Sequence, residues 1–350
     1  MNKKRYFTIC GIIAAAGLVI AGIGFAFGGR FYGIEFSKKG PRICSNVRLP
    51  GMNDYEEKEE ALDAFDSLDI DCTFSDVNVI KSDHYGISYY VAKSNVPQYK
   101  VSDGELKLEQ PKGIIREKGR YRFSFHFDID DIEEDYINIY VPENFAGKSL
   151  KIKTSSGDVS LDAMNFKKVK LENDFGDVNF DSIECETFDA ELSSGSVDIN
   201  QLKGNSIKAV TKFGNLDIKT IQASESKLES ESGTIDVDKI VGNRLDVKSK
   251  FGSIELKKAD VSEKVDVECE SGDVALGGIV AKDVQVESKF GSVEIGIDNM
   301  EDYSYDCTAR LGEISVDGRG VAGSYMEKNP NAAKNVKITS ESGEVEIYED

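Results

Sequence analysis

The densest cluster of side chains that could bind a metal ion is an acidic run in the first half of the chain. Its sequence is FDIDDIEED, and it contains Asp128, Asp130, Asp131, Glu133, Glu134 and Asp135. Calcium prefers carboxylate oxygens, so Asp128, Asp130 and Asp131 are the candidate ligands. The run lacks the D-x-D-x-D-G spacing of a calcium loop, and the calcium-binding nonapeptide repeat is absent elsewhere. A solvated acidic turn is therefore the favoured interpretation, and we predict no metal or cofactor.

Six cysteines are the candidate thiol nucleophiles or zinc ligands: Cys10, Cys44, Cys72, Cys185, Cys269 and Cys307. None forms a C-x-x-C pair, which disfavours zinc and thioredoxin-type redox chemistry. Cys72, Cys269 and Cys307 fall in the inward-facing columns described below, so we expect them in the core. Cys185 lies near a return loop where it could be exposed, and Cys44 lies in a linker where it could cross-link two protomers.

The sequence offers little for an enzyme active site. The two histidines, His84 and His126, have no serine or cysteine partner that the sequence places beside them. Glycan-cleaving enzymes need carboxylates that face each other across a groove, whereas the carboxylates here are scattered along every repeat. There is no Trp to stack on a sugar ring. We predict a protein that is not an enzyme, with a polysaccharide-active enzyme as the least favoured hypothesis.

The net charge of −20 excludes whole classes of partner. Nucleic-acid binding needs clustered Lys and Arg side chains, which this acidic chain does not have. Tight docking on an anionic lipid surface is disfavoured for the same reason. A charge of this sign keeps a protein soluble and attracts cations or basic partners.

The amino terminus predicts a membrane anchor. Lys3, Lys4 and Arg5 precede an apolar stretch from Tyr6 to Phe27. As a helix of ~1.5 Å per residue the stretch is roughly 33 Å long, enough to cross a ~30 Å hydrocarbon core. Because a basic flank stays inside, residues 1–5 are expected in the cytoplasm and the remainder outside the cell membrane. A cleaved signal peptide is the alternative.

One pattern dominates the chain after residue 150: a small residue or Phe, then Gly, then alternating polar and apolar residues. The glycines are Gly157, Gly176, Gly195, Gly214, Gly233, Gly252, Gly272, Gly291, Gly312 and Gly343, with successive gaps of 19, 19, 19, 19, 19, 20, 19, 21 and 31 residues. A period near 20 residues is typical of stacked supersecondary units.

The residues around each glycine predict how one unit is built. Apolar residues lie seven and five positions before most of the glycines, and a mostly small residue lies three before, which is the alternation of a strand. Apolar residues lie two and four positions after it, so the inward parity changes at the Gly. Two consecutive strands can keep one inward face only if the chain turns a corner there, and glycine permits the backbone that a corner needs. Each coil is therefore predicted to contain two strands, a glycine corner and a return segment.

The residue immediately before the glycine alternates between Phe and Ser. We expect this alternation to reflect large and small side chains that stack inside the solenoid. A β-propeller blade would have a similar length of about 38 residues, and it remains the structural alternative. A propeller needs hairpin turns, yet Asp103-Gly104 and Asp317-Gly318 are the only clear cases.

The repeat sets the domain boundaries. The segment FSDVNV, residues 74–79, nearly duplicates FGDVNF at 175–180, so the β-solenoid domain is predicted to cover residues 65–350 with Ser75 in a glycine position. Residues 81–149 are predicted to be inserted hairpins that cap one end, because a bare solenoid end exposes edge strands. The long gap after Gly312 is predicted to be a loop or a cap at the other end. Residues 28–64 read as a linker with a short acidic helix, capped by Asn53 with Glu56 three residues later.

The repeated SGDVSL and FGSVEI units, the INIYVP strand followed by LKIKTSSGDVSL, and the N-terminal apolar stretch resemble the DUF4097 family, also called the "putative adhesin" family of β-strand-repeat envelope proteins. The resemblance covers about residues 65–350. It implies a β-solenoid-like fold, a Gram-positive envelope setting and a connection to envelope-stress regulation, and it carries over no catalytic residue.

The sequence thus predicts an all-β fold, a parallel β-solenoid (β-helix) of ~19-residue repeats with a hairpin cap, preceded by one transmembrane helix. The first functional hypothesis is an adhesin-like surface module that binds or scaffolds a protein or glycan partner. The alternative is a sensory or regulatory envelope component that acts through a membrane partner, because residues 1–5 are too few for a signalling domain.

Overall fold

The computed structural model describes residues 33–37, 40–44, 55–111, 120–123 and 135–350. The chain divides into two units, the first formed by residues 1–54 and 113–133 and the second by residues 55–112 and 134–350. The described part of the first unit is an antiparallel sheet in the order β2-β1-β9, with β1 at Gly33–Ser37, β2 at Gly40–Cys44 and β9 at Arg120–Phe123. The predicted linker and insertion therefore contribute strands to a separate sheet.

The predicted transmembrane helix, residues 6–27, lies outside the described ranges. Within them, no helix is long and apolar enough to cross a membrane.

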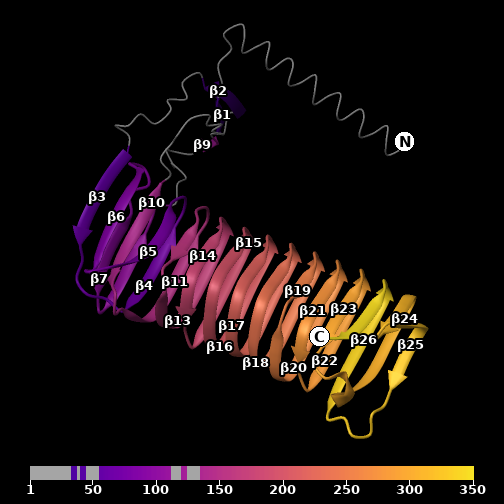
Figure 1. The fold of residues 1–350 in the computed structure, drawn as a ribbon. Helices are drawn as coiled ribbons and strands as arrows, with labels where there is room; N and C mark the ends of the chain where they lie inside the picture. Colours follow the sequence, from indigo (N-terminus) through magenta and orange to yellow (C-terminus); the bar gives the residue numbers. More distant parts are fainter. Residues whose placement is uncertain (1–32, 38–39, 45–54, 112–119, 124–134) are drawn as a thin grey trace. The chain divides into compact units, whose positions relative to one another are not determined.

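The second unit is built almost entirely of strands (Figure 1). Its one helical element among the described residues is a 3-10 turn, η2, at Met300–Asp302. In chain order the strands are β3 (Tyr55–Ala61), β4 (Ser67–Cys72), β5 (Asp76–Ser82), β6 (Gly86–Ala92), β7 (Gln98–Ser102), β8 (Glu105–Glu109), β10 (Tyr136–Pro142), β11 (Ala146–Thr154), β12 (Val159–Leu161), β13 (Met164–Phe175), β14 (Val178–Glu184), β15 (Thr187–Ser194), β16 (Val197–Phe213), β17 (Leu216–Ser232), β18 (Ile235–Phe251), β19 (Ile254–Leu256), β20 (Ala259–Ser271), β21 (Val274–Val280), β22 (Asp283–Phe290), β23 (Val293–Ile297), β24 (Tyr303–Val316), β25 (Arg319–Glu327), β26 (Lys334–Ser342) and β27 (Val345–Glu349).

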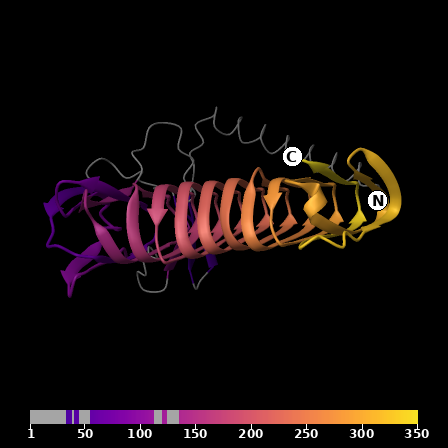
Figure 2. The same cartoon turned by 60° about the horizontal axis from the view of Figure 1, so that its bottom comes forward.

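The repeats stack as parallel coils, as the sequence predicts (Figures 1 and 2). β16, β17 and β18 each contain 17 residues and run from one glycine corner to the next. Ile199 pairs with Ile218, and Ile218 pairs with Val237, so equivalent residues of successive coils lie side by side. The body is an all-β, parallel β-solenoid-like stack, and the propeller alternative is wrong because its glycine-flanked strands are paired in parallel.

Each regular coil has three faces. The first face holds the residues eight to two positions before the corner glycine, the second the residues two to five after it, and the third the residues six to nine after it. The pairing of β16 with β17 shows this division. The two strands pair at Val197–Ile199, Gln201–Gly204 and Ser206–Thr211, and one unpaired residue separates each stretch from the next. The expected return segment is thus a third strand ladder, and the apolar columns of all three faces form one continuous core.

The corner glycines are held by direct backbone contact between coils. Nine of the ten, all except Gly312, have φ between +136° and +151°, a region that side chains strongly disfavour. A Cβ atom on any of these nine would lie 2.0–2.4 Å from the carbonyl oxygen of the corner residue in the adjacent coil. Gly312 lacks the positive φ because β24 runs through its corner, but its Cβ would lie 2.1 Å from the carbonyl oxygen of Gly343.

The inner side of most corners is polar, although Leu192 and Ala309 occupy the equivalent position at two of them. In several coils the small residue three positions before the glycine donates to a corner carbonyl, for example Thr211 Oγ1 to Gly195 at 3.2 Å and Ser249 Oγ to Gly252 at 2.8 Å. Asn173 Nδ2 donates to two corner carbonyls, at 3.0 and 3.2 Å. These bonds satisfy carbonyl groups that the corner removes from the regular ladder.

The expected inward stacking of the Phe and Ser residues is wrong. Phe74, Phe175, Phe213, Phe251 and Phe290 are 50–63% exposed, and Leu311 in the same position is 75% exposed. Strand alternation alone would point the residue before the glycine inward. The corner carbonyls and the groups that hydrogen-bond to them already occupy that inner side. The residue before the glycine therefore points outward.

The first coil is formed by β4 and β5, and Ser75 takes the glycine position as predicted. Leu68 and Ile70 pair with Leu150 and Ile152 of the next coil. The hairpin of β7 and β8 turns at Asp103-Gly104, both with positive φ, and adds β8 parallel to β4. On the second face β10 pairs with β5, and β6 and β3 follow antiparallel.

Gln110, which follows β8, closes the corner of the first coil. Its side chain is buried, its Oε1 accepts from the backbone N–H groups of Thr73 and Phe74 at 2.9 and 3.2 Å, and its Nε2 donates to Ser75 Oγ at 2.6 Å. The amide thus satisfies donors that would otherwise need another coil.

The predicted short acidic helix at residues 53–65 is wrong, because Tyr55–Ala61 forms strand β3, antiparallel to β6. Glu and Lys favour helices, but an isolated seven-residue helix is unstable in water. Pairing with β6 supplies main-chain hydrogen bonds, and the charged side chains of β3 suit an exposed edge.

The carboxyl-terminal coil is inserted out of sequence order. β26 pairs with β22 on one side and with β24 on the other, so the last repeat in sequence lies between two earlier ones. The predicted loop or cap is a strand, β25, which follows a turn at Asp317-Gly318 and lies antiparallel to β24.

Replacing one corner glycine should destabilise the whole stack. In Gly233→Ala the new Cβ would lie 2.0 Å from the Gly214 carbonyl oxygen, at a φ of +148°. We expect a loss of about 2–4 kcal/mol, seen as a lower thermal midpoint by circular dichroism. The control is Gly320→Ala, where nothing lies within 4 Å of the new Cβ. Equal midpoints for the two variants would contradict the corner contact.

Candidate binding surfaces

Four of the cysteines lie in the core of the solenoid. Cys72, Cys185, Cys269 and Cys307 are all free and buried. This agrees with the prediction for three of them, but the exposure considered for Cys185 is wrong, because it lies in an inward column of the third face. Burial raises the pKa of Cys72, Cys185 and Cys307 to about 12, so these thiols stay protonated at neutral pH. Cys44 is the last residue of β2, and Cys10 lies outside the described residues.

His84 lies in an exposed turn, where its Nδ1 is 2.6 Å from Asp83 Oδ1 and 3.3 Å from Ser82 Oγ. A Ser-His-Asp triad needs the serine and the carboxylate on opposite ring nitrogens. Here both partners meet the same nitrogen, so the cluster cannot perform that chemistry. His126 lies outside the described residues.

The candidate calcium ligands Asp128, Asp130 and Asp131 also lie outside the described residues. Asp135, which ends the acidic run, accepts hydrogen bonds from Ala92 N and Asn95 Nδ2, both at 3.3 Å, which links it to the end of β6. Across the part of the chain that the structure describes, no group of three His, Cys, Asp or Glu side chains is arranged to hold a metal ion.

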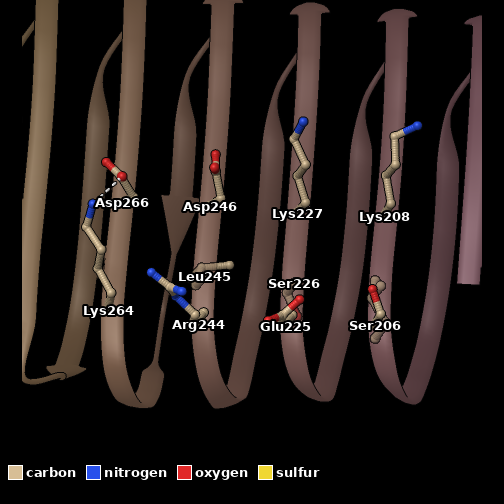
Figure 3. Close-up of a pocket in the computed structure, with 11 residues that line it drawn as sticks. Ser206, Lys208, Glu225, Ser226, Lys227, Arg244, Leu245, Asp246, Lys264 and Asp266 are labelled. Carbon is tan, nitrogen blue, oxygen red and sulfur yellow. Dashed lines mark hydrogen bonds and ion pairs between the residues drawn. The ribbon is translucent and has the colours of Figure 1, made fainter. Parts of the chain in front are cut away.

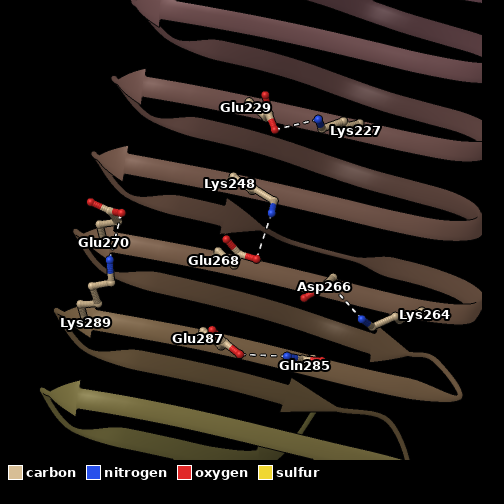
Figure 4. A network of polar contacts seen from close by, with 10 residues as sticks. All are labelled: Lys227, Glu229, Lys248, Lys264, Asp266, Glu268, Glu270, Gln285, Glu287 and Lys289. Atoms are coloured by element: carbon tan, nitrogen blue, oxygen red, sulfur yellow. Dashed lines mark hydrogen bonds and ion pairs between the residues drawn. The ribbon is translucent and has the colours of Figure 1, made fainter.

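The first face carries a network of ion pairs (Figure 4). Some bridge neighbouring coils, such as Lys248 to Glu268 at 2.9 Å, and others lie within a strand, such as Lys264 to Asp266 at 2.6 Å. These pairs are half exposed, so each contributes little to stability. Their effect is to leave a flat face of alternating, mutually compensated charge.

A shallow groove of about 380 Å³ crosses the start of this face (Figure 3). Two columns of side chains line it across four successive coils. One runs Lys208, Lys227, Asp246 and Asp266, and the other runs Ser206, Glu225, Arg244 and Lys264. Burial raises the pKa of Asp246. Cations and carboxylates are mixed along its length, and they do not converge on one point as acid–base catalysis requires.

The second face carries an acidic column. Asp198, Asp217, Asp236 and Glu255 pair in register on four successive coils, about 4.8 Å apart along the stack. Burial and the neighbouring carboxylates, Asp198 first among them, raise the pKa of Asp217. This column attracts cations or basic groups, and it costs stability at neutral pH.

The corner edge between the first and second faces carries the exposed apolar residues. We call Phe74, Phe175, Phe213, Phe251, Phe290 and Leu311, with the serines between them, the aromatic row. Phe175 pairs with Ser194, and Ser194 pairs with Phe213, so a large residue recurs at every second coil. With strands about 4.8 Å apart, the rings are about 9.6 Å apart. An ordered line of exposed rings is a candidate interaction surface. The Phe/Ser alternation in the sequence revealed the period of the aromatic row but not the outward direction of its side chains.

Stacked three-faced coils, a compensated first face and an exposed aromatic row define a β-solenoid repeat protein with extended surfaces. The profile of the Toastrack DUF4097 family matches residues 65–278 and 186–348. The chain belongs to this family, as the resemblance in its sequence predicts.

The solved structures that resemble the chain are distant. A "putative adhesin" from Bacteroides fragilis NCTC 9343 is 14% identical, with a TM-score of 0.39, over 86% of this chain and 99% of that one. A "putative cell adhesion protein" from Clostridium sporogenes ATCC 15579 is 13% identical, with a TM-score of 0.20, over 85% and 100%. No match is found among curated proteins.

Removing one charge from the acidic column should stabilise the protein at neutral pH. A carboxyl with a raised pKa in the folded state costs stability when ionised, and the cost disappears as the pH falls and the proton is taken up. We expect Asp217→Asn to raise the thermal midpoint at pH 7 by an amount equivalent to roughly 0.5 kcal/mol, since water screens the site. The gain should vanish near pH 4.

The matched control for this prediction is Asp238→Asn. Asp238 pairs with Lys257 at 2.6 Å, so its replacement should bring no gain. An Asp217→Asn midpoint at or below that of the wild type at pH 7 would contradict the repulsive column.

Thiol labelling should separate folded from unfolded chains. We expect Cys72, Cys185, Cys269 and Cys307 to resist maleimide at pH 7.5 in the folded protein, because they are buried and protonated, and to react in 8 M urea. Peptide mass spectrometry assigns the labelled positions. Rapid labelling of Cys185 in the folded protein would show that the third face opens.

Proposed function

We propose that this chain is a non-enzymatic, adhesin-like module of the cell surface that binds or scaffolds a macromolecular partner. The residues 6–27 would anchor it as a single-pass membrane protein, with residues 1–5 in the cytoplasm and the solenoid outside. The observation that carries the proposal is the aromatic row, because it places exposed rings at a fixed interval on a rigid stack. A repeating line of contacts suits an extended partner better than a small substrate.

The distribution of titratable groups supports binding over catalysis. The charged side chains of the first face are paired with one another within and between coils, and Cys72, Cys185, Cys269 and Cys307 are buried. Catalysis needs a few groups with perturbed pKa values that converge on one cavity. The groove of the first face is instead shallow and lined by groups spread over four coils, and a second shallow groove, on the second face near Asn78 and Asp198, spans five coils.

The experiment is retention of the purified full-length chain on two supports, envelope polysaccharide and vesicles from the envelope membrane. Retention on the vesicles is counted only above that on protein-free vesicles of the same lipids, because residues 6–27 would insert into either. We expect retention on at least one of them, no release of reducing ends, and at least a tenfold loss of retention in Phe213→Ser/Phe251→Ser/Phe290→Ser. Retention on membranes alone would favour the regulatory hypothesis, in which the partner is a membrane protein. Release of reducing ends would contradict the non-enzymatic assignment, and no retention on either support would contradict binding.

A further inference from the structure

The aromatic row alternates in space more regularly than in sequence. In sequence the last row residues are Phe290, Leu311 and Ser342, so two large residues follow one another. In the fold, Ser342 pairs with Phe290 on one side and with Leu311 on the other. The inserted carboxyl-terminal coil therefore restores the alternation. From one end of the stack to the other the row reads Phe74, Ser156, Phe175, Ser194, Phe213, Ser232, Phe251, Ser271, Phe290, Ser342 and Leu311.

A second column alternates in charge in step with the row. The residue just before each row residue is basic where the row residue is large and acidic where it is Ser, through seven successive coils. In coil order these residues are Lys212, Glu231, Lys250, Glu270, Lys289, Glu341 and Arg310. Neighbours bond within the chain, as Lys250 to Glu231 at 2.7 Å and Lys289 to Glu270 at 3.0 Å. The alternation does not extend to the three coils between the first coil and the coil of Lys212. There the equivalent residues are Ser155, Asp174 and Ser193.

A surface that alternates large with small and positive with negative is complementary to itself when shifted by one coil. Each ring then faces the gap over a serine, and each cation faces a carboxylate. We propose that the aromatic row is the interface to a second copy of this chain, packed edge to edge and antiparallel about a twofold axis perpendicular to the stack. This inference rests on the proposed function, because it names the partner of the same binding surface.

The twofold axis fixes the arrangement. An axis parallel to the stack would set every coil against its own equivalent, so that Phe meets Phe. An axis perpendicular to the stack reverses the coil order, keeps the charged columns facing each other, and makes the contact isologous and closed. Placed between the coils of Phe251 and Ser271, it sets Phe251 against Ser271 of the second copy and Lys250 against its Glu270.

The same placement satisfies the remaining coils of the overlap. Phe213 meets Ser342 of the second copy, Phe290 meets Ser232, and Leu311 meets Ser194. In the charged column Lys212 meets Glu341 and Lys289 meets Glu231. Shifting the axis towards the amino terminus by one coil brings Glu341 against Asp174, which is repulsive, and shifting it the other way shortens the overlap. The charge pattern thus selects one register.

The size and charge of the row suit such a contact. Burying an aromatic side chain removes roughly 150–250 Å² from water, so the large residues of the overlap, more than half exposed, offer on the order of 500 Å² of apolar area per copy. The serines and charged neighbours bring this towards the roughly 800 Å² per partner of a stable interface. The charged column is nearly balanced, with three carboxylates and four cations, so the net charge of −20 acts mainly away from the contact.

A glycan is the competing occupant, because sugar rings stack on aromatic side chains. A neutral sugar polymer would use the rings, but it would gain nothing from a basic residue beside each ring and an acidic one beside each serine. The coupled alternation therefore favours a second copy.

The first measurement is the mass of the purified full-length chain in detergent, by light scattering over a concentration series. We expect twice the chain mass, and for Phe213→Ser/Phe251→Ser/Phe290→Ser a dimer dissociation constant at least about 100-fold higher. Met326→Ser is the control, because Met326 is 66% exposed but lies on β25, outside the row. Unchanged circular dichroism shows that the triple variant is folded.

A charge exchange tests the complementarity of the charged columns. One variant carries Lys212→Glu, Lys250→Glu and Lys289→Glu, and the other carries Glu231→Lys, Glu270→Lys and Glu341→Lys. Each alone should dissociate, because like charges then face each other, and the two mixed should form a heterodimer. Dissociation of both variants alone and in mixture would overturn the proposed pairing of the charged columns.

The outcomes separate this inference from the proposed function. A wild-type chain that stays monomeric at all concentrations overturns the second copy. If that monomer is retained on polysaccharide and the triple Phe variant is not, the row binds a glycan and the proposed function stands. Persistence of the dimer in the triple Phe variant also overturns the inference, because self-association then arises elsewhere in the chain.

Discussion

The stack depends on one contact, in which the carbonyl oxygen of each corner residue lies against the Cα of the next corner glycine. A side chain at that position would overlap the oxygen, since a Cβ would lie only 2.0–2.4 Å from it. The contact brings successive corners to the same spacing as the strands, so one hydrogen-bonded ladder can pass from face to face. It also leaves corner carbonyls inside the coil, which explains why the inward residue three positions earlier is small and polar in most coils, as in Thr211 and Ser249.

A stack with unpaired ends would recruit other strands, so each end must be closed by different means. At the amino-terminal end, antiparallel strands replace further coils, and Gln110 supplies acceptors to the corner of the first coil. Lys58 and Glu60 on β3 both bond to Tyr99 on β7, which ties the two end strands together. At the other end β25 lies antiparallel to β24. The solenoid is therefore finite by construction, and lateral contacts along its edge remain open.

The sequence predicts the features that repeat and misses those that occur once. The period, the inward columns and the turns at Asp103-Gly104 and Asp317-Gly318 follow from local residue chemistry. The insertion of the last coil and the role of Gln110 depend on contacts between distant segments, which no local pattern encodes. The aromatic row is predicted in part. Its period was visible in the sequence, but the alternation of the strand predicted that its side chains point inward. The row residue points outward although the strand extends through it, because the corner carbonyls and the groups that bond to them occupy the inner side.

The corner contact also explains how the aromatic row and the charged column stay aligned over many coils. The coil between Gly252 and Gly272 has one extra residue, and the structure absorbs it as a register shift opposite Gly242 and Arg244, between the third and first faces. The corners, and with them the row and the charged column, keep their alignment. An insertion at the corner would instead rotate every later side chain to the opposite face. Length variation is thus confined to the side of the coil remote from the row, and this is what allows a single pattern of size and charge to extend across the repeats as one continuous surface.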